Sequence, residues 1–167
     1  MLKIALIVAG VLGLVVVAVV AVGYALPQAH VASREKVIAQ PPERIYRALT
    51  EVEKYPGWRS DVQKVDVLSQ GPVTRWREHG SNGAITFEMA EHQPPARLVS
   101  RIADTSLAFG GTWTYELSGQ SQGTRLKITE QGEVYNPVFR FMSRFVFGHA
   151  ATMEKFLADL EKHLAQT

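Results

Sequence analysis

The sequence predicts an α+β domain in which a curled antiparallel sheet of six or seven strands surrounds one long C-terminal helix, preceded by a transmembrane helix. Three observations support this fold class: an uncharged apolar run from Ile4 to Leu26, alternating apolar residues from Asp61 to Val134, and helically spaced apolar residues from Pro137 to Ala165. Alternation is typical of strands with one buried face, whereas spacing by three and four is typical of an amphipathic helix.

The N-terminal run, Ile4 to Leu26, contains 23 residues and no charge. As a helix it would be roughly 35 Å long, enough to cross the hydrocarbon core of a bilayer, and Pro27 would end it. A cleaved signal peptide is the alternative, although its apolar region usually has only about 7–15 residues. We therefore divide the chain into residues 1–29, a transmembrane anchor or signal peptide with its linker, and residues 30–167, one folded domain.

Charges on the two sides of the apolar run give opposing signals about its orientation. Lys3 on a short N-terminal side is typical of anchors whose following domain is exported, whereas Arg34, Lys36 and Arg44 favour a cytoplasmic domain under the positive-inside rule. We expect a single-pass membrane protein with its soluble domain on the extracytoplasmic side.

The elements of the domain follow from its turn residues and from the period of its apolar residues. The expected strands cover His30–Gln40, Asp61–Ser69, Val73–His79, Ala84–Glu91, Ala96–Ala103, Phe109–Leu117 and Thr124–Val134. Pro42 begins a short helix with Ile45 and Leu49 on one face, and a second short helix is expected around Trp58.

Asn136 and Pro137 suit the cap and the first position of the long helix that extends to Ala165. One amphipathic helix covers only part of one face of a sheet this large, so the sheet must curl around it. The space that remains between them predicts an internal cavity of roughly 300 Å³ or more, large enough for an apolar ligand.

Four stretches of the domain carry a resemblance to a known superfamily. They are Pro41–Thr50, Tyr55–Trp58, Gly111–Leu117 and Gly123–Glu130, followed by the helix that begins at Pro137. In these stretches the chain resembles the START-like (SRPBCC) superfamily, and more specifically its polyketide cyclase/dehydrase and lipid-transport branch. The resemblance implies the helix-grip fold over about residues 30–164. It also implies a pocket for a lipid, polyketide or hormone, with catalysis in only some members.

Strand parity selects the residues that point into the expected cavity. Glu78 shares a strand face with Trp76, and Glu130 shares one with Ile128, so both carboxylates are expected inside. Each could hold the polar group of a ligand, act as a general acid or base, or form a structural ion pair with a cation of the long helix. The candidate cations are Arg140, Arg144 and His149. The complete set of expected ligand-binding residues is Trp58, Trp76, Glu78, Phe87, Met89, Trp113, Tyr115, Glu130, Phe141, Phe145 and His149.

Composition and motifs argue against several classes of function. The 18 basic and 16 acidic residues are interleaved, whereas a nucleic-acid binder has a basic stripe or patch. The absence of cysteine excludes disulfides and zinc–thiolate sites. No Gly-x-Ser-x-Gly motif, phosphate-binding loop or His-x-x-x-His pair occurs, so we predict no catalytic residue, cofactor or metal.

These observations favour a membrane-anchored binding or transfer module for a lipid or another hydrophobic small molecule. One alternative is a cyclase/dehydratase-type enzyme that uses Glu78 or Glu130 as its acid or base. Another is a protein-interaction module that uses the Phe-rich stretch Val138–Phe147, which is apolar on nearly all sides. The same stretch could instead close the pocket entrance or lie on the bilayer surface.

Overall fold

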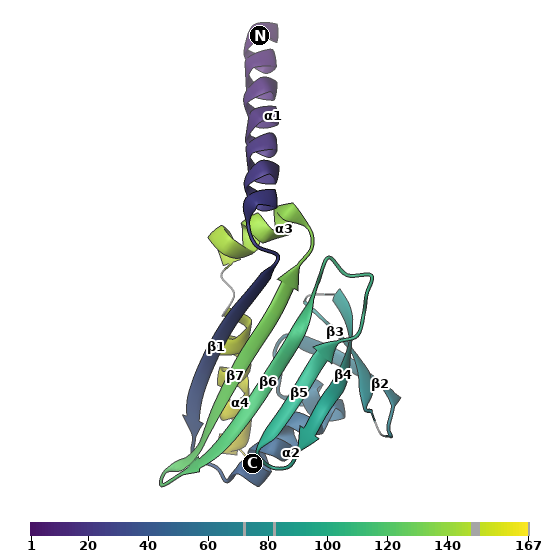
Figure 1. Ribbon diagram of the computed structural model, residues 1–167, viewed down its shortest axis with the longest axis vertical. Coiled ribbons are helices and arrows are strands. Elements are labelled where there is room, and N and C mark those ends of the chain that lie inside the picture. Colours follow the sequence, from purple (N-terminus) through teal and green to yellow (C-terminus); the bar gives the residue numbers. More distant parts are fainter. Residues whose placement is uncertain (72, 82, 148–150, 167) are drawn as a thin grey trace.

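The computed structural model describes residues 1–71, 73–81, 83–147 and 151–166. The strands of its sheet are β1 (Ala29–Ile38), β2 (Val62–Ser69), β3 (Arg75–Gly80), β4 (Gly83–Gln93), β5 (Arg97–Ile102), β6 (Phe109–Gln120) and β7 (Gly123–Val134). The helices are α1 (Leu2–Ala25), α2 (Pro42–Thr50), α3 (Pro137–Met142) and α4 (Ala151–Gln166), with a 3-10 helix η1 (Val52–Gly57) and a π-helical segment η2 (Ser143–Phe147). The helix α1 projects from one end of the domain (Figure 1).

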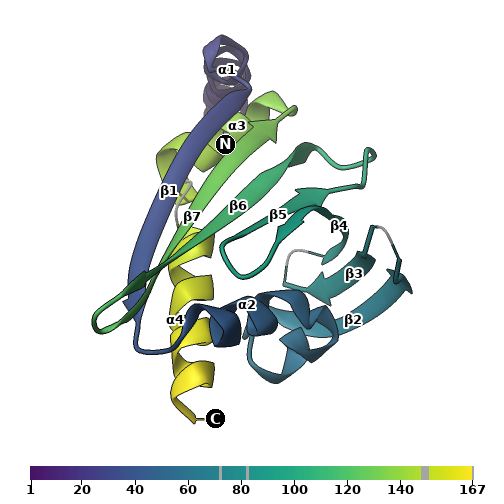
Figure 2. The ribbon, with the colours of Figure 1, turned by 60° about the horizontal axis from the view of Figure 1, so that its bottom comes forward.

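The seven strands form one antiparallel sheet in the order β1-β7-β6-β5-β4-β3-β2. Hairpins or short loops join the strands from β2 to β7, whereas β1 reaches the opposite edge of the sheet and pairs with β7. The sheet curls around α4, and α2 and η1 cover the concave face beside it (Figure 2). The predicted α+β helix-grip fold, with its N-terminal apolar helix, is therefore confirmed.

The strand register defines the end of the sheet from which α1 projects. Ala29, the first residue of β1, lies opposite Glu133 of β7, and the first residue of β6 lies opposite Val134. At the other edge of the sheet, Val62 at the start of β2 lies opposite Gly80 at the end of β3. Because neighbouring strands alternate in direction, the β3–β4 turn and the end of β5 belong to this same end, which we call the α1 end of the sheet.

The hydrophobic core fills the half of the concave face away from the α1 end. It joins apolar side chains of α2 and α4 to those of β1 and β5–β7. Its most deeply buried members are Ile38, Ile45, Leu49, Leu98, Leu126, Ile128, Met153 and Leu160. The apolar residues of α4 recur every three or four positions, as the sequence predicts, and burial of each is worth roughly 1.5–3 kcal/mol.

The C-terminal helical region is divided instead of forming the single helix expected from Pro137 to Ala165. Asn136 caps α3 as predicted, but α3 ends at Met142 and the π-helical η2 follows it, while α4 is described from Ala151; residues 148–150 lie outside the described part of the chain. The two helices have different partners, because α3 packs against α1 whereas α4 packs on the sheet (Figure 1). Helical spacing of apolar residues does not reveal which surface they pack against, so the sequence pattern predicts one continuous helix.

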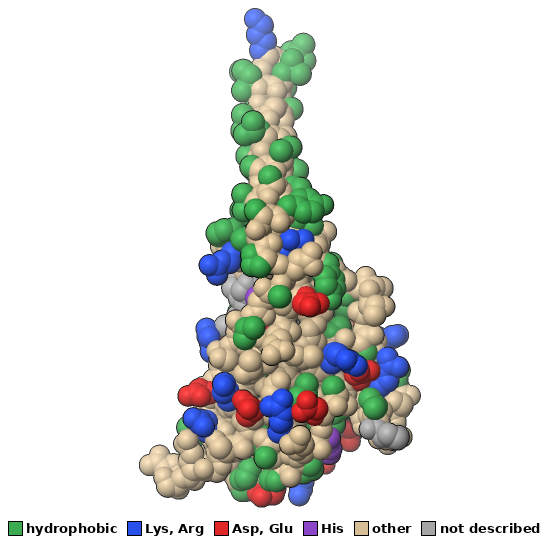
Figure 3. All heavy atoms as spheres, viewed as in Figure 1, with side chains coloured by type: hydrophobic (Ala, Val, Ile, Leu, Met, Phe, Trp, Pro, Cys, Tyr) green, Lys and Arg blue, Asp and Glu red, His purple; other side chains and the backbone are tan. Residues whose placement is uncertain are grey.

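The junction between α1 and α3 is close at Gly23, the buried residue of α1. A Cβ atom at Gly23 would lie 2.0 Å from the carbonyl oxygen of Pro137, so only glycine allows this approach. Beyond the junction α1 has apolar side chains on its surface, as Figure 3 shows on one side. Among the described residues, α1 is the one helix long and apolar enough to cross a membrane, a test that a signal sequence also passes.

Arg140 strengthens the same junction. Its side chain is only 6% exposed, and its guanidinium donates hydrogen bonds of 3.0 Å to the main-chain oxygens of Leu26 and Tyr135. The guanidinium also lies 6.0 Å from the centre of the Tyr24 ring. Leu26 is the C-terminal cap of α1, where a positive charge is favourable because it complements the helix dipole. Arg140 therefore joins α1 to the domain.

We expect Gly23→Ala to separate α1 from α3, because the added methyl group clashes with the Pro137 carbonyl. Gly13→Ala is the matched control, since a Cβ atom there meets nothing within 4 Å. In the full chain in detergent, hydrogen exchange at the α3 amides should accelerate at least about tenfold in Gly23→Ala, equivalent to losing one hydrogen bond to a charged group, about 1.5 kcal/mol. Equal exchange in both variants would contradict the role given to Gly23.

Candidate functional site

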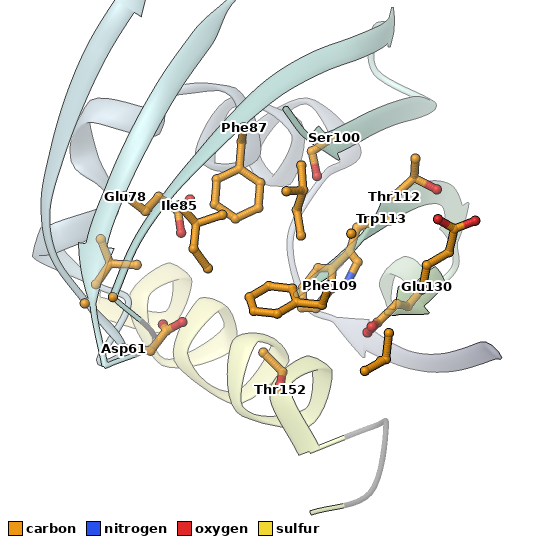
Figure 4. Close-up of a pocket in the computed structure, with 18 of the residues that line it drawn as sticks. Asp61, Glu78, Ile85, Phe87, Ser100, Phe109, Thr112, Trp113, Glu130 and Thr152 are labelled. Atoms are coloured by element: carbon orange, nitrogen blue, oxygen red, sulfur yellow. The ribbon is translucent and has the colours of Figure 1, made fainter. Parts of the chain in front are cut away.

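A cavity of about 300 Å³ lies between the sheet and α4, at the α1 end (Figure 4). All seven strands contribute to its lining, together with η1, α3, η2 and α4. Apolar and aromatic walls are formed by Val62, Trp76, Ile85, Phe87, Ile102, Phe109, Trp113, Tyr115, Val134 and Phe139. The cavity predicted from the helix-to-sheet proportions is thus present at about the predicted size.

The position of the cavity follows from where helices cover the sheet. The core fills one half of the concave face with α2, η1 and most of α4. The helical residues that line the cavity are Tyr55 of η1, Phe139 of α3, Ser143 of η2 and Thr152 of α4. These few side chains do not fill the concave face at the α1 end, so space remains between them and the strands.

One wall of the cavity carries a buried arginine between two carboxylates. Arg59, which follows η1, donates hydrogen bonds from Nε and Nη2 to the two carboxylate oxygens of Asp61, at 3.2 and 2.7 Å. Its Nη1 donates to Oε1 of Glu78 at 2.9 Å, and the indole Nε1 of Trp76 donates to the same oxygen at 2.9 Å. The strand-parity argument that placed Glu78 inside with Trp76 agrees with this geometry.

Two aromatic rings complete the surroundings of Arg59. Its guanidinium carbon lies 5.1 Å from the centre of the Tyr55 ring and 5.3 Å from that of Phe156, distances at which a cation is attracted to the face of a ring. Burial disfavours the charge on Arg59, but the carboxylates of Glu78 and Asp61 outweigh it and raise the pKa of the guanidinium. Arg59 is therefore a permanent cation in the wall of the cavity.

The two carboxylates that share Arg59 respond to it differently. Burial raises the pKa of Glu78, and the opposing charge of Arg59 with the hydrogen bond from Trp76 only partly offsets this effect. For Asp61 burial acts in the same direction, but the hydrogen bonds and charge of Arg59 outweigh it and lower the pKa. Asp61 is thus the ionised partner of Arg59, whereas Glu78 is the group on this wall that takes up a proton more readily than an ordinary glutamate.

Further carboxylates lie on the opposite side of the cavity, where Figure 4 shows Glu130 across from Glu78 and Asp61. Glu130 lies 3.3 Å from Nε2 of His30 in β1, and Glu133 accepts a hydrogen bond of 2.8 Å from the hydroxyl of Tyr135. Among the described lining residues, four carboxylates thus accompany two basic groups, Arg59 and His30. This excess favours a ligand whose polar end donates hydrogen bonds over one that carries a negative charge.

The structure brings together only part of the predicted set of ligand-binding residues. Those that line the cavity are Trp76, Glu78, Phe87, Trp113, Tyr115 and Glu130. His149 lies outside the described residues. The assignment of the six lining residues to ligand binding stays a prediction.

The remaining predicted residues have structural partners elsewhere. Trp58 packs against Tyr55, Phe156 and His163, at ring-centre distances of 5.4, 5.4 and 5.7 Å. Met89 packs against the hydrophobic core. Phe141 and Phe145 contact each other at 4.9 Å outside the cavity. Phe141 belongs to α3, which packs against α1 instead of the sheet, and Phe145 belongs to η2, which directly follows α3.

The prediction that Glu78 and Glu130 pair with a cation of the long helix was wrong for the cations of that helix that the structure describes. Arg140 is bonded to main-chain oxygens at the α1 junction, and the carboxylates Glu78 and Glu130 interact with Arg59 and His30 instead. Arg59 lies in the connection before β2, where no hydrophobic period marks the direction of a side chain. Its closeness in sequence to Asp61 was the only available signal, and pairing of β2 with β3 was needed to bring Glu78 beside it.

The geometry of the sheet, helix and cavity agrees with the comparisons with known proteins. Residues 29–165 match the family described as polyketide cyclase / dehydrase and lipid transport, and the chain belongs to this family. Members of the same START-like fold class are expected to hold hydrophobic ligands, and the apolar cavity is consistent with that. No curated protein matches the chain in sequence.

Solved structures show the same fold at low sequence identity. A protein from Thermus thermophilus superposes with a TM-score of 0.69 at 22% identity, covering 83% of this chain and 99% of its own. An aromatase/cyclase from Streptomyces sp. R1128 has a TM-score of 0.65 at 13% identity, over 81% and 93% of the two chains. A START superfamily protein from Mycobacterium smegmatis has a TM-score of 0.64 at 17% identity, over 82% and 98%. At these identities the likeness concerns the fold alone.

We expect Glu78→Gln and Asp61→Asn to change stability with opposite dependence on pH. Because the pKa of Glu78 is raised in the folded state, its contribution to folding stability is fully present below the ordinary value of 4.5. That contribution is lost as pH rises through the folded-state pKa. Gln does not titrate, so the stability of Glu78→Gln relative to the wild type should rise as pH increases from 4.5 to 8.

The lowered pKa of Asp61 gives the reverse dependence. Its contribution is present above the ordinary value of 3.8 and is lost as pH falls through the lower folded-state pKa. Asp61→Asn should therefore cost about 1.5–3 kcal/mol at pH 8, and still cost it at pH 5. Thermal unfolding of the full chain in detergent, followed by near-ultraviolet circular dichroism from pH 8 to pH 3, checks both. Parallel curves for the two variants would show that the carboxylates are equivalent.

Proposed function

We propose that the protein is a membrane-anchored module that binds or transfers a lipid or another hydrophobic small molecule in its internal cavity. The observation that carries this proposal is the cavity of about 300 Å³, whose walls are mostly aromatic and aliphatic and whose polar groups are concentrated in a few places. Such a combination is typical of sites that bury an apolar ligand and orient it through one polar end.

The polar lining narrows the class of ligand. The Arg59 guanidinium is already engaged by Asp61 and Glu78, so it offers little to a carboxylate or phosphate. Glu130, on the opposite side, remains an acceptor for a hydroxyl or amide group. We therefore favour a neutral amphiphile with a hydrogen-bond-donating end, such as a long-chain alcohol, over an anionic lipid.

The helix α1 supports the membrane part of the proposal. It contains 24 residues, about 36 Å of helix, and its charged residue is Lys3 near its start. A short N-terminal tail that bears Lys3 tends to stay on the cytoplasmic side of the membrane. We therefore place the domain on the extracytoplasmic side. Under the positive-inside rule, Arg34 and Lys36 of β1 and Arg44 of α2 favour the opposite orientation.

Acid–base catalysis of the cyclase/dehydratase type is the second candidate function. The observation that favours it is Glu78, a carboxyl group with a raised pKa that lies in the cavity wall beside a permanent cation. Such a group keeps its proton to a higher pH than an ordinary glutamate and can donate that proton to a bound molecule. A ligand recovered chemically changed from the wild type but unchanged from Glu78→Gln would support this candidate.

The anchor is tested by fractionation of cells that express the full chain. We expect the protein to stay in the membrane pellet after alkaline carbonate extraction, because a helix of this length buries its apolar surface in the bilayer. Mass spectrometry of the pelleted protein should still detect the N-terminal peptide that contains Lys3. A protein that lacks this peptide would show that α1 is a cleaved signal sequence, and a soluble protein that retains it would refute the anchor.

The cavity is tested with a photoactivatable long-chain alcohol that carries a diazirine. In detergent, we expect it to crosslink to peptides of β5 and β6, whose side chains line the cavity. Ile102→Trp places a larger ring in the cavity, and Leu68→Trp makes a comparable change at a side chain that is 51% exposed. Crosslinking should fall at least about tenfold in Ile102→Trp, the effect of losing about 1.4 kcal/mol of binding free energy. Equal crosslinking in both variants would contradict cavity binding.

A further inference from the structure

We infer that α3 and η2 lie on the surface of the same bilayer that α1 crosses, and that the mouth of the cavity opens toward that bilayer. The ligand would then pass from the lipid phase into the cavity without crossing bulk water. This inference rests on the proposed function and deepens it, because it assigns the source of the ligand and the entrance of the site.

The location of the cavity supports the inference first. Most cavity residues of the sheet come from the start of β1, β2 and β6, the end of β5 and β7, and the β3–β4 hairpin, and strand pairing places these positions at the α1 end. Trp76, Phe87, Trp113 and Tyr115 extend the lining toward the middle of the sheet. The cavity therefore faces the end of the domain from which the anchor projects, whereas the packed core occupies the other end.

The helix α3 lies between the anchor and the cavity. Phe139 of α3 is 53% exposed and also lines the cavity, so its ring is at the boundary between the cavity and the outside. Ser143, at the start of η2, lines the cavity beside it. A ligand that passes α3 thus enters next to the end of α1 (Figure 1).

The exposed face of this region is apolar. Val138 and Phe139 of α3 and Phe145 of η2 are 42, 53 and 60% exposed. Phe and Leu side chains on such a face bury themselves about 5–10 Å into the boundary between headgroups and acyl chains. Arg144 is exposed beside them, where a lipid phosphate provides a favourable partner.

The junction fixes the height of α3 relative to the bilayer. The helix α1 is about 36 Å long and the hydrocarbon core is about 30 Å thick, so the last turn of α1 lies at the headgroup level. Tyr24 in that turn is an aromatic residue of the kind found at this level. Because Gly23 contacts Pro137 and Arg140 caps α1, α3 is held at the same level instead of being carried on a flexible tether.

The chain has no cysteine, so a single environment-sensitive fluorophore can report on this surface. We would label Phe145→Cys in the full chain, reconstituted in vesicles of phosphatidylcholine with a minor share of phosphatidylglycerol. Ser121→Cys, in the exposed turn between β6 and β7 at the far end of the sheet, is the matched control. Brominated phosphatidylcholine quenches a label in the lipid, and aqueous iodide quenches a label in water.

We expect the label at position 145 to shift to the blue and to be quenched by brominated lipid at least fivefold more than the label at position 121. Iodide should quench the two labels in the opposite order. A label at position 145 that iodide quenches as strongly as the control, and that brominated lipid leaves unchanged, would overturn the inference.

Crosslinking with the diazirine alcohol, incorporated in the same vesicles, separates this result from the proposed function. Lipid quenching at position 145 without any crosslink to the cavity peptides would support membrane docking but refute ligand binding. Crosslinks to the cavity peptides without lipid quenching would support ligand binding but refute the bilayer-facing entrance. Both results together are the outcome that we expect.

Discussion

A mismatch in length between the sheet and the helix it surrounds governs this structure. The strands β6 and β7 have 12 residues each, about 40 Å of extended chain, whereas the 16 described residues of α4 form about 24 Å of helix. The sheet must curl to bury its apolar face on so short a helix, and part of its concave face stays uncovered. With α2 and most of α4 packed at one end, the uncovered part lies toward the other end, and there it becomes the cavity, with Tyr55 of η1 in its wall.

The polar groups of the cavity are arranged around one buried cation. Arg59 is stabilised by two carboxylates and two aromatic rings, and this arrangement keeps its charge despite its burial. A single cation cannot neutralise both carboxylates, so the environment separates them into an ionised Asp61 and a Glu78 that is more easily protonated. The cavity therefore contains one group that stays charged for structural reasons and one whose protonation can respond to a ligand or to pH.

The junction at Gly23 and Arg140 connects this cavity to the N-terminal helix. The helix α1 would be an independent tether if its end were joined to the domain only through the backbone. Instead α3 packs on its last turn, and Arg140 binds the oxygen of its C-terminal cap. The direction in which α1 projects is thereby coupled to the end of the sheet where the cavity lies, and the same short segment, α3, contributes both to the junction and to the cavity lining.

The sequence by itself determined the order of the strands along the chain, the apolar N-terminal helix, the capped start of α3 and the inward direction of Glu78 and Glu130. These features depend on local periods and on turn residues, which a single chain segment expresses. Only the tertiary structure decided that the C-terminal helical region is divided between α1 and the sheet, that Arg59 is the partner of Glu78, and that Arg140 caps α1. Each of these depends on which distant segments meet, and neither the period of apolar residues nor the spacing of charges records a contact between segments far apart in the chain.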